Sequence, residues 1–161
     1  MTTWRRERRQ LHHGMMWLLI QSDRGKIPVR HQGNGVKFYA LTMIDAVTNY
    51  VELQRVEGTA ARAAAQAFET RWLFCYPRPE QLIHDQCTEF MGEGFQASLR
   101  QWGIRNAPIG VRNPQANAVC ERMHQVVGNV LRTIIHSYPP QHTEQANGMV
   151  GYALQTAAYA V

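Results

Sequence analysis

The chain has 161 residues, of which 45% are apolar and 18% are charged, a composition typical of one globular domain rather than a disordered chain. Its apolar runs are too short to cross a bilayer, and its basic start lacks the pattern of a secretory signal, so neither a membrane span nor secretion is predicted. The net charge of +5 is compatible with DNA as a partner.

The first residues of the chain differ in character from the rest. Residues 1–14 are polar and basic, and we interpret them as a tail or linker, whereas 15–161 carry the apolar patterns of a domain whose last helix is cut short. Three widely spaced cysteines form no C-x-x-C pair, so no zinc module is predicted. Their odd number favours a reducing, intracellular compartment.

Strands are expected first along the chain. Patterns typical of strands lie at 15–21, 36–44 and 50–56, with turn residues between them. An alanine-rich helix is expected over 60–74, with Thr59 as its N-cap.

Short strands and helices alternate in the second half. We expect strands at 81–84 and 104–107, and helices at 95–102, 113–135 and from about 143 onwards, with Gly103 ending the first of these helices. The order predicts an α/β fold with a mixed five-stranded sheet. Three strands would form an antiparallel meander, two further strands would run in parallel, and helices would flank the sheet.

The long helix expected at 113–135 has two distinct faces. Its apolar face is expected to be core and comprises Val119, Met123, Val126, Val127, Val130 and Ile134. Its polar face comprises Asn117, Glu121, Gln125, Asn129 and Arg132. A carboxylate within a row of uncharged hydrogen-bonding residues suits a metal site with a nucleic-acid backbone lying along the helix.

Two acidic residues have the context of a metal site. Asp85 follows the apolar strand at 81–84, where ligand sites in open α/β sheets collect, and Glu121 lies near the start of the long helix. Thirty-five residues, 86–120, separate them. Carboxylates that meet in this way can hold two divalent metals about 3.5–4 Å apart, the arrangement that breaks and makes phosphodiester bonds.

The stretch from about residue 17 to 135 resembles the catalytic core of retroviral and LTR-retrotransposon integrases, especially those of the gypsy type. The resemblance is carried by 39–45 (YALTMID), 83–90 (IHDQCTEF) and 113–124 (NPQANAVCERMH). It implies a ribonuclease-H-like fold and a site with two Mg²⁺ ions, with Mn²⁺ as an alternative. It also implies 3′-end processing of element DNA and strand transfer into target DNA.

The resemblance further implies partners and a location. The partners would be DNA, both element ends and target, and other copies of the same chain in a homo-oligomer. The protein would act in the nucleus or in a retroelement particle. Residues expected to contact DNA are Asn113, Gln115, Asn117, Gln125 and Arg132.

A third catalytic acid is expected beside Asp85 and Glu121, and two residues are candidates for it. In this family the metal-binding Asp comes from the first strand, which pairs with the strand that carries Asp85, and Asp23 stands just after the strand expected at 15–21. Asp45 follows the second strand and is expected to cap the turn that leads to Tyr50. We prefer Asp23, with Asp45 as the alternative, because metal ligands must converge on one point. Asp23, Asp85 and Glu121 are therefore the predicted catalytic and metal-binding residues.

Three departures from the family pattern keep other interpretations open. Gln86 and Cys87 stand where the family usually has Asn-Gly, and a side chain at positive φ would be strained there. Arg24 follows Asp23, where the family tends to have an apolar residue, and could compete with metal for the carboxylates. The zinc-binding N-terminal module and the C-terminal DNA-binding domain are missing. The chain therefore looks like a fragment of a polyprotein or a decayed copy. The alternatives are an inactive integrase-derived fold that binds DNA or protein, and a nuclease acting on RNA–DNA hybrids.

Overall fold

The structure is a computed structural model that describes residues 17–29, 32–108 and 114–159. The basic tail expected over 1–14 and the candidate DNA contact Asn113 lie outside these residues. Within the described part of the chain, none of the helices combines the length and apolarity that crossing a lipid bilayer would need.

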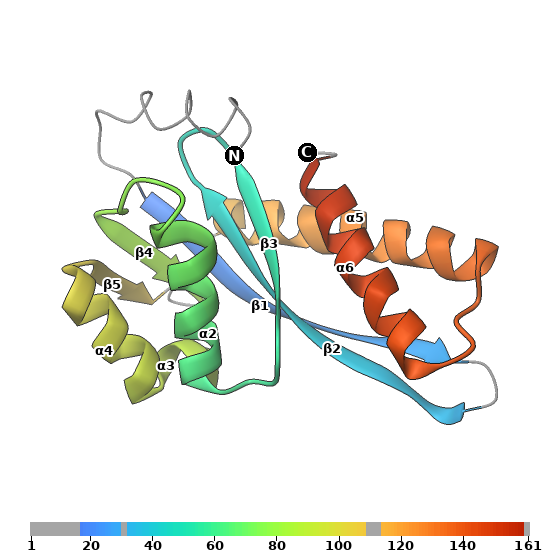
Figure 1. The fold of residues 1–161 in the computed structure, drawn as a ribbon. Helices are drawn as coiled ribbons and strands as arrows, with labels where there is room; N and C mark the ends of the chain where they lie inside the picture. The colour runs from blue at the N-terminus through green and yellow to red at the C-terminus, as the bar shows by residue number, and fades with distance from the viewer. Residues whose placement is uncertain (1–16, 30–31, 109–113, 160–161) are drawn as a thin grey trace.

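One sheet organises the domain. Its strands are β1 (Trp17–Val29), β2 (Gln32–Asp45), β3 (Val51–Val56), β4 (Gln81–His84) and β5 (Arg105–Pro108). They lie in the order β3-β2-β1-β4-β5, as Figure 1 shows. β1, β2 and β3 pair antiparallel as a meander, and β4 pairs in parallel with both β1 and β5. The mixed α/β class expected from the sequence is confirmed.

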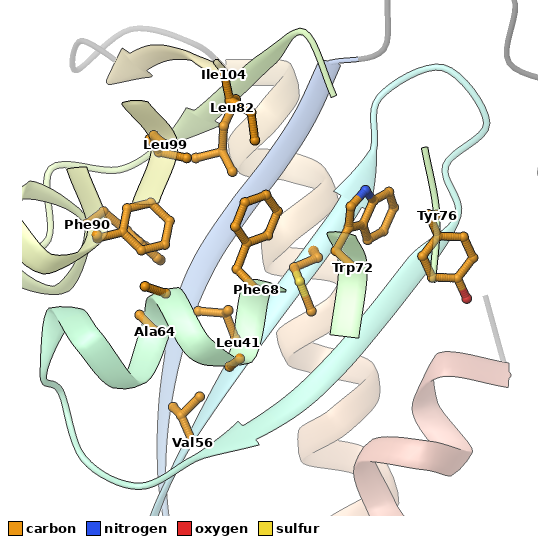
Figure 2. Close-up of a cluster of buried hydrophobic side chains, with 14 residues drawn as sticks. Leu41, Val56, Ala64, Phe68, Trp72, Tyr76, Leu82, Phe90, Leu99 and Ile104 are labelled. Carbon is orange, nitrogen blue, oxygen red and sulfur yellow. The ribbon is translucent and has the colours of Figure 1, made fainter. Parts of the chain in front are cut away.

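One face of the sheet is covered by the helices in the middle of the chain. These are α2 (Ala61–Phe68), the π-helical turn η1 (Glu69–Leu73), α3 (Thr88–Met91) and α4 (Glu93–Trp102). Figure 2 shows their shared core, in which Phe68 and Trp72 belong to one cluster with Leu41 of β2 and Leu82 of β4. The end of β4 is therefore fixed by buried apolar packing.

The other face is covered by α5 (Pro114–Ser137) and α6 (Thr143–Tyr159), which pack against each other (Figure 1). Side chains of β2 contribute alternately to the cores on the two faces of the sheet. Leu41 belongs to the first core cluster, on the α2–α4 face, whereas Ala40 and Ile44 belong to the second, on the α5–α6 face. Successive strand side chains point to opposite faces, so a strand buried on both sides is apolar at nearly every position. The sequence pattern of β2 is explained by this double burial.

The apolar face predicted for the long helix is confirmed where its side chains are described. Met123 and Val127 are buried in the second core cluster, and Val126, Val130 and Ile134 pack against it. The polar row on the same helix is thereby turned away from the core.

Several local predictions need correction. The strands expected at 15–21 and 36–44 are longer, because β1 continues to Val29 and β2 begins at Gln32. The helix expected over 60–74 changes at Glu69 into the π-helical turn η1, so only 61–68 is α-helical. Its N-cap is Ala60, which makes no side-chain capping bond, rather than Thr59. The short helix α3 was not expected; Gly92 separates it from α4, and a Cβ there would lie 2.5 Å from the Cβ of Ala61. Close packing against α2 thus requires glycine at this position.

Candidate active site

The two acids at the sheet follow the same end of one parallel strand pair. The last register pair of β1 and β4 is Ile20 opposite His84. Asp85 is the next residue along the chain after His84, and Asp23 lies three residues beyond Ile20 on β1. The carboxyl ends of parallel strands are where ligand sites collect in open α/β sheets. The backbone of Asp23 is described, but its side chain lies outside the described set.

The Asp85 carboxylate is half-buried and held by its own loop. The backbone N–H of Cys87 donates to Asp85 Oδ1 at 3.4 Å, and the Cys87 thiol donates to Asp85 Oδ2 at 3.0 Å. Both donors come from two residues downstream, in the manner of an Asx turn. Each carboxylate oxygen keeps further lone pairs that can accept other bonds or bind a cation.

The backbone after Asp85 is free of the strain expected from the sequence. Cys87 has φ −64° and ψ 151°, an extended conformation that precedes α3. Among the described residues other than glycine, positive φ occurs at Asn49 and not at Gln86 or Cys87. The loop therefore does not need glycine at these positions, and the prediction that a side chain would be strained there is wrong.

His84 is buried completely, so it is unable to reach a phosphate from solvent. Its ring lies 5.3 Å from the ring of Phe90 and 6.4 Å from that of Phe95, measured between centroids. The ring contacts the main chain of Asp85 rather than the solvent side of the loop. His84 is thus part of the support beneath the candidate site.

Glu121 lies on the exposed side of α5. Its neighbours on the predicted polar row, Gln125, Asn129 and Arg132, are also exposed, and Arg132 donates a hydrogen bond to the side chain of Asn129. The row is therefore accessible from solvent, as a nucleic-acid contact requires. Gln115 and Asn117 belong to the same helix, but their side chains are not among those described.

The Asp45 carboxylate is hydrogen-bonded within the turn that follows β2. It is buried and accepts bonds from the Val47 backbone N–H at 3.0 Å and from the Thr48 hydroxyl at 2.5 Å. It thus caps the turn between β2 and β3, as expected from the sequence. Asp45 pairs with Leu18 across β1, five residues before Asp23. At about 3.3 Å per residue, the two acids are separated by about 16 Å along the strand.

The described side chains do not by themselves assemble a metal site. Among them, no group of three His, Cys, Asp or Glu residues is arranged to hold a metal ion. That search does not include the Asp23 side chain. The structure thus places Asp85 at the strand end and Glu121 on an exposed helix face, while the meeting of the three acids stays a prediction.

Sequence reasoning missed several residues around Asp85. Cys87 was treated as a departure and proves to be a hydrogen-bond partner of Asp85, and Asn106 on β5 contacts the His84 ring. Glu89 is a buried acid, with 2% of its surface exposed, and its carboxylate accepts a hydrogen bond from the Thr88 hydroxyl. Its place four residues after Asp85 in a short acidic motif was the one available signal.

The comparisons with known proteins bear on the fold. No family model matches the sequence, and no curated protein matches it. The catalytic core domain of BIV integrase aligns with a TM-score of 0.63 and 20% identity, over 88% of this chain and 81% of that chain. The HTLV-2 integrase catalytic core domain in complex with magnesium, in its trimeric form, aligns with a TM-score of 0.60 and 16% identity, over 86% of this chain and 82% of that chain.

A third similar structure belongs to a larger assembly. A chain of the simian T-cell lymphotropic virus intasome in complex with PP2A regulatory subunit B56 gamma aligns with a TM-score of 0.67 and 15% identity. The alignment covers 90% of this chain and 50% of that chain. The chain therefore has the fold of retroviral integrase catalytic cores, the ribonuclease-H-like fold that its motifs led us to expect.

Proposed function

We propose that the protein is a polynucleotidyl transferase that integrates retroelement DNA, by 3′-end processing followed by strand transfer into target DNA. The observation that carries the proposal is the position of Asp85, a half-exposed carboxylate at the carboxyl end of β4 within an integrase-core fold. Glu121 follows after thirty-five intervening residues, with its side chain exposed on α5. Asp23, three residues beyond the last β1–β4 pair on the neighbouring strand, is proposed as the third acid.

Strand order favours Asp23 over Asp45. β1 lies next to β4, at a strand spacing of about 4.8 Å, whereas β2 lies two spacings away. Asp45 would therefore have to span about 9.6 Å across the sheet to reach the side of Asp85. Its carboxylate is also committed to the turn through Val47 and Thr48. These two facts support Asp23 as the metal-binding acid.

The proposed donors fit a hard divalent cation. Carboxylate oxygens are the ligands that Mg²⁺ prefers, and Asp85 keeps free lone pairs beside its bonds from Cys87. Asp23, Asp85 and Glu121 would hold two Mg²⁺ ions, which would supply charge neutralisation at the scissile phosphate. The protein itself would orient the carboxylates, with Asp85 fixed by its loop.

The exposed row on α5 is proposed as the DNA contact. Glu121, Gln125, Asn129 and Arg132 lie exposed along one helix face, and amide and guanidinium groups donate to phosphate oxygens. The proposal includes self-association, because the HTLV-2 integrase core is known in both a dimeric and a trimeric form. We propose that this chain also forms a homo-oligomer.

The test is strand transfer by the purified protein. The substrate is a DNA duplex with recessed 3′ ends, supplied with a target duplex and Mg²⁺. We expect transfer by the wild type and a loss of at least about 100-fold in Asp85→Asn, because one metal ligand is removed. Glu93→Gln is the matched control, since Glu93 is an exposed acid outside the site. Cleavage of an RNA–DNA hybrid in place of transfer, or full activity in Asp85→Asn, would overturn the proposal.

A further inference from the structure

The imidazole of His84 joins the ends of β4 and β5. Its Nδ1 lies 2.5 Å from the main-chain carbonyl oxygen of Asp85, and its Nε2 lies 2.6 Å from Oδ1 of Asn106. Asn106 pairs with Leu82 in the register of the two parallel strands. The ring thus connects Asp85, at the start of the loop before α3, with Asn106 on the neighbouring strand β5. Asn106 lies twenty-two residues after His84 in the sequence.

The orientation of Asn106 is fixed by a further hydrogen bond. The carbonyl oxygen of Phe90 can only accept, so Gln96 presents its Nε2–H to that oxygen at 2.6 Å. Gln96 Oε1 then accepts from Nδ2–H of Asn106 at 3.0 Å, which leaves Asn106 Oδ1 facing the His84 ring. Phe90, Gln96 and Asn106 are joined by hydrogen bonds, and the His84 ring lies between Asn106 Oδ1 and the main-chain oxygen of Asp85. Both of these oxygens can only accept, so a ring nitrogen that carries hydrogen donates to the one it faces. We call this run of contacts the β4–β5 chain.

The ring of His84 has no freedom to turn within this chain. It is fully buried, with the rings of Phe90 and Phe95 against it. Rotation would break the contact with Asp85 or the contact with Asn106, and burying a polar group without a partner is unfavourable. The main chain of Asp85 is therefore held from β5, while its carboxylate is held by Cys87.

We propose that Asn106 is a positioning residue for Asp85 and acts through the His84 ring. The inference rests on the proposed function, because it assigns Asn106 a role in metal binding at Asp85. Mg²⁺ demands near-ideal octahedral geometry, so a displaced Asp85 carbonyl and side chain weaken the site. Residues that hydrogen-bond to metal ligands and orient them affect metal affinity or activity by about 10–100-fold when they are mutated.

The experiment compares substitutions at Asn106, whose side chain is reached without opening the core because the residue is exposed. Asn106→Leu removes the oxygen that faces His84, and Asn106→Asp retains an oxygen there. Arg105→Leu is the matched control, since Arg105 is the preceding exposed residue of β5 and its side chain makes a 3.8 Å surface pair with Glu80. Gln96→Leu releases the amide of Asn106 from the other side.

Two readouts are measured for each variant. The first is Mg²⁺ affinity of the DNA-free protein, from shifts of the Asp85 and Cys87 amide signals in NMR titrations. The second is strand transfer, with kcat, the KM for DNA and the Mg²⁺ concentration for half-maximal rate. In Asn106→Leu we expect Mg²⁺ affinity and kcat to fall about tenfold with the KM for DNA unchanged. Asn106→Asp should stay near the wild type, and Gln96→Leu should fall between.

The outcomes separate this inference from the proposed function. Wild-type Mg²⁺ affinity and kcat in Asn106→Leu would overturn the positioning role, even if strand transfer by the wild type is established. A fall in Asn106→Leu that Arg105→Leu and Asn106→Asp share equally would also overturn it, because a general effect on β5 would then suffice. Weakened Mg²⁺ binding in Asn106→Leu, with no strand transfer by the wild type, would support the positioning role and reject the proposed reaction.

Discussion

The Cys87 thiol donates a hydrogen bond to Oδ2 of Asp85 at 3.0 Å, and the Cys87 backbone N–H reaches Oδ1 of the same carboxylate. Cys87, at a position where the pattern that the sequence resembles usually has glycine, thus contacts the acid proposed to bind metal. Its backbone is extended, so the side chain is accommodated without strain. Cys87 is partly exposed, which places a thiol within reach of solvent beside the candidate site.

Alkylation of Cys87 should therefore block the proposed site. In a Cys75→Ser, Cys120→Ser background, N-ethylmaleimide should reduce strand transfer by more than about tenfold, because an adduct on Sγ displaces the thiol from Asp85 and fills the space in front of it. The measurement is strand transfer against the extent of modification by mass spectrometry. Adding Cys87→Ser to the same background should make the protein resistant.

Removing the thiol itself should matter much less. A thiol is a weak donor, so Cys87→Ala should lower kcat only a few-fold, and the backbone N–H bond to Asp85 should persist. Steady-state kinetics of Cys87→Ala beside Cys87→Ser measures this. A loss of 100-fold in Cys87→Ala would mean that the sulfur takes part in the chemistry, contrary to the role given to it here.

Asp45 should contribute to stability and not to chemistry. Its buried carboxylate caps the β2–β3 turn through Val47 and Thr48, so Asp45→Ala should lower the free energy of unfolding by about 1–3 kcal/mol. Urea unfolding gives the value. Val47→Ala is the control, because the Val47 side chain is 66% exposed and should change stability little. Equal stability of Asp45→Ala and wild type would contradict the capping role.

A tyrosine at the edge of the first core should make the fold sensitive to alkali. Burial, and then the hydrogen bond to Glu52, raise the pKa of Tyr76 far above its ordinary value of 10.0. Tyr50 and Arg71 face the same Glu52 carboxylate. Above pH 10 the unfolded chain loses the Tyr76 proton while the folded chain keeps it. Stability contributed below pH 10 is thus lost as the pH rises, by about 1.4 kcal/mol per pH unit for one group.

Urea unfolding between pH 9 and 11 tests this dependence. Tyr76→Phe should be less stable than the wild type at neutral pH, because the bond to Glu52 is lost, and should show a shallower decline above pH 10. Parallel declines in the two proteins would show that other groups cause the alkaline loss of stability.

Features set by neighbours in sequence were predictable. The limits of β4 agree with the expected 81–84, and Gly103 ends α4 with φ +63° as a left-handed cap. The Asp45 turn was also predicted, since Asp, Thr and Asn within five residues are typical of a local hydrogen-bonded turn. Each of these depends on a short stretch whose residue types favour one conformation.

Features set by packing were not predictable. A helical pattern over 60–74 gives no sign of the π-helical turn at Glu69–Leu73, because the apolar spacing changes by only one residue. The contact between His84 and Asn106 joins residues twenty-two positions apart, and only the parallel pairing of β4 with β5 brings them together. The family pattern predicts glycine at the position of Cys87, but the extended backbone there does not require it.

The central claim is that Asp23, Asp85 and Glu121 form the catalytic set and Asp45 does not. The most direct measurement is Mg²⁺-dependent strand transfer by Asp23→Asn, Asp45→Asn, Asp85→Asn and Glu121→Gln, each assayed below its own Tm beside the wild type. We predict that Asp45→Asn stays within a few-fold of the wild type and that the other three lose at least about 100-fold. Full activity in Asp23→Asn together with loss in Asp45→Asn would contradict the account.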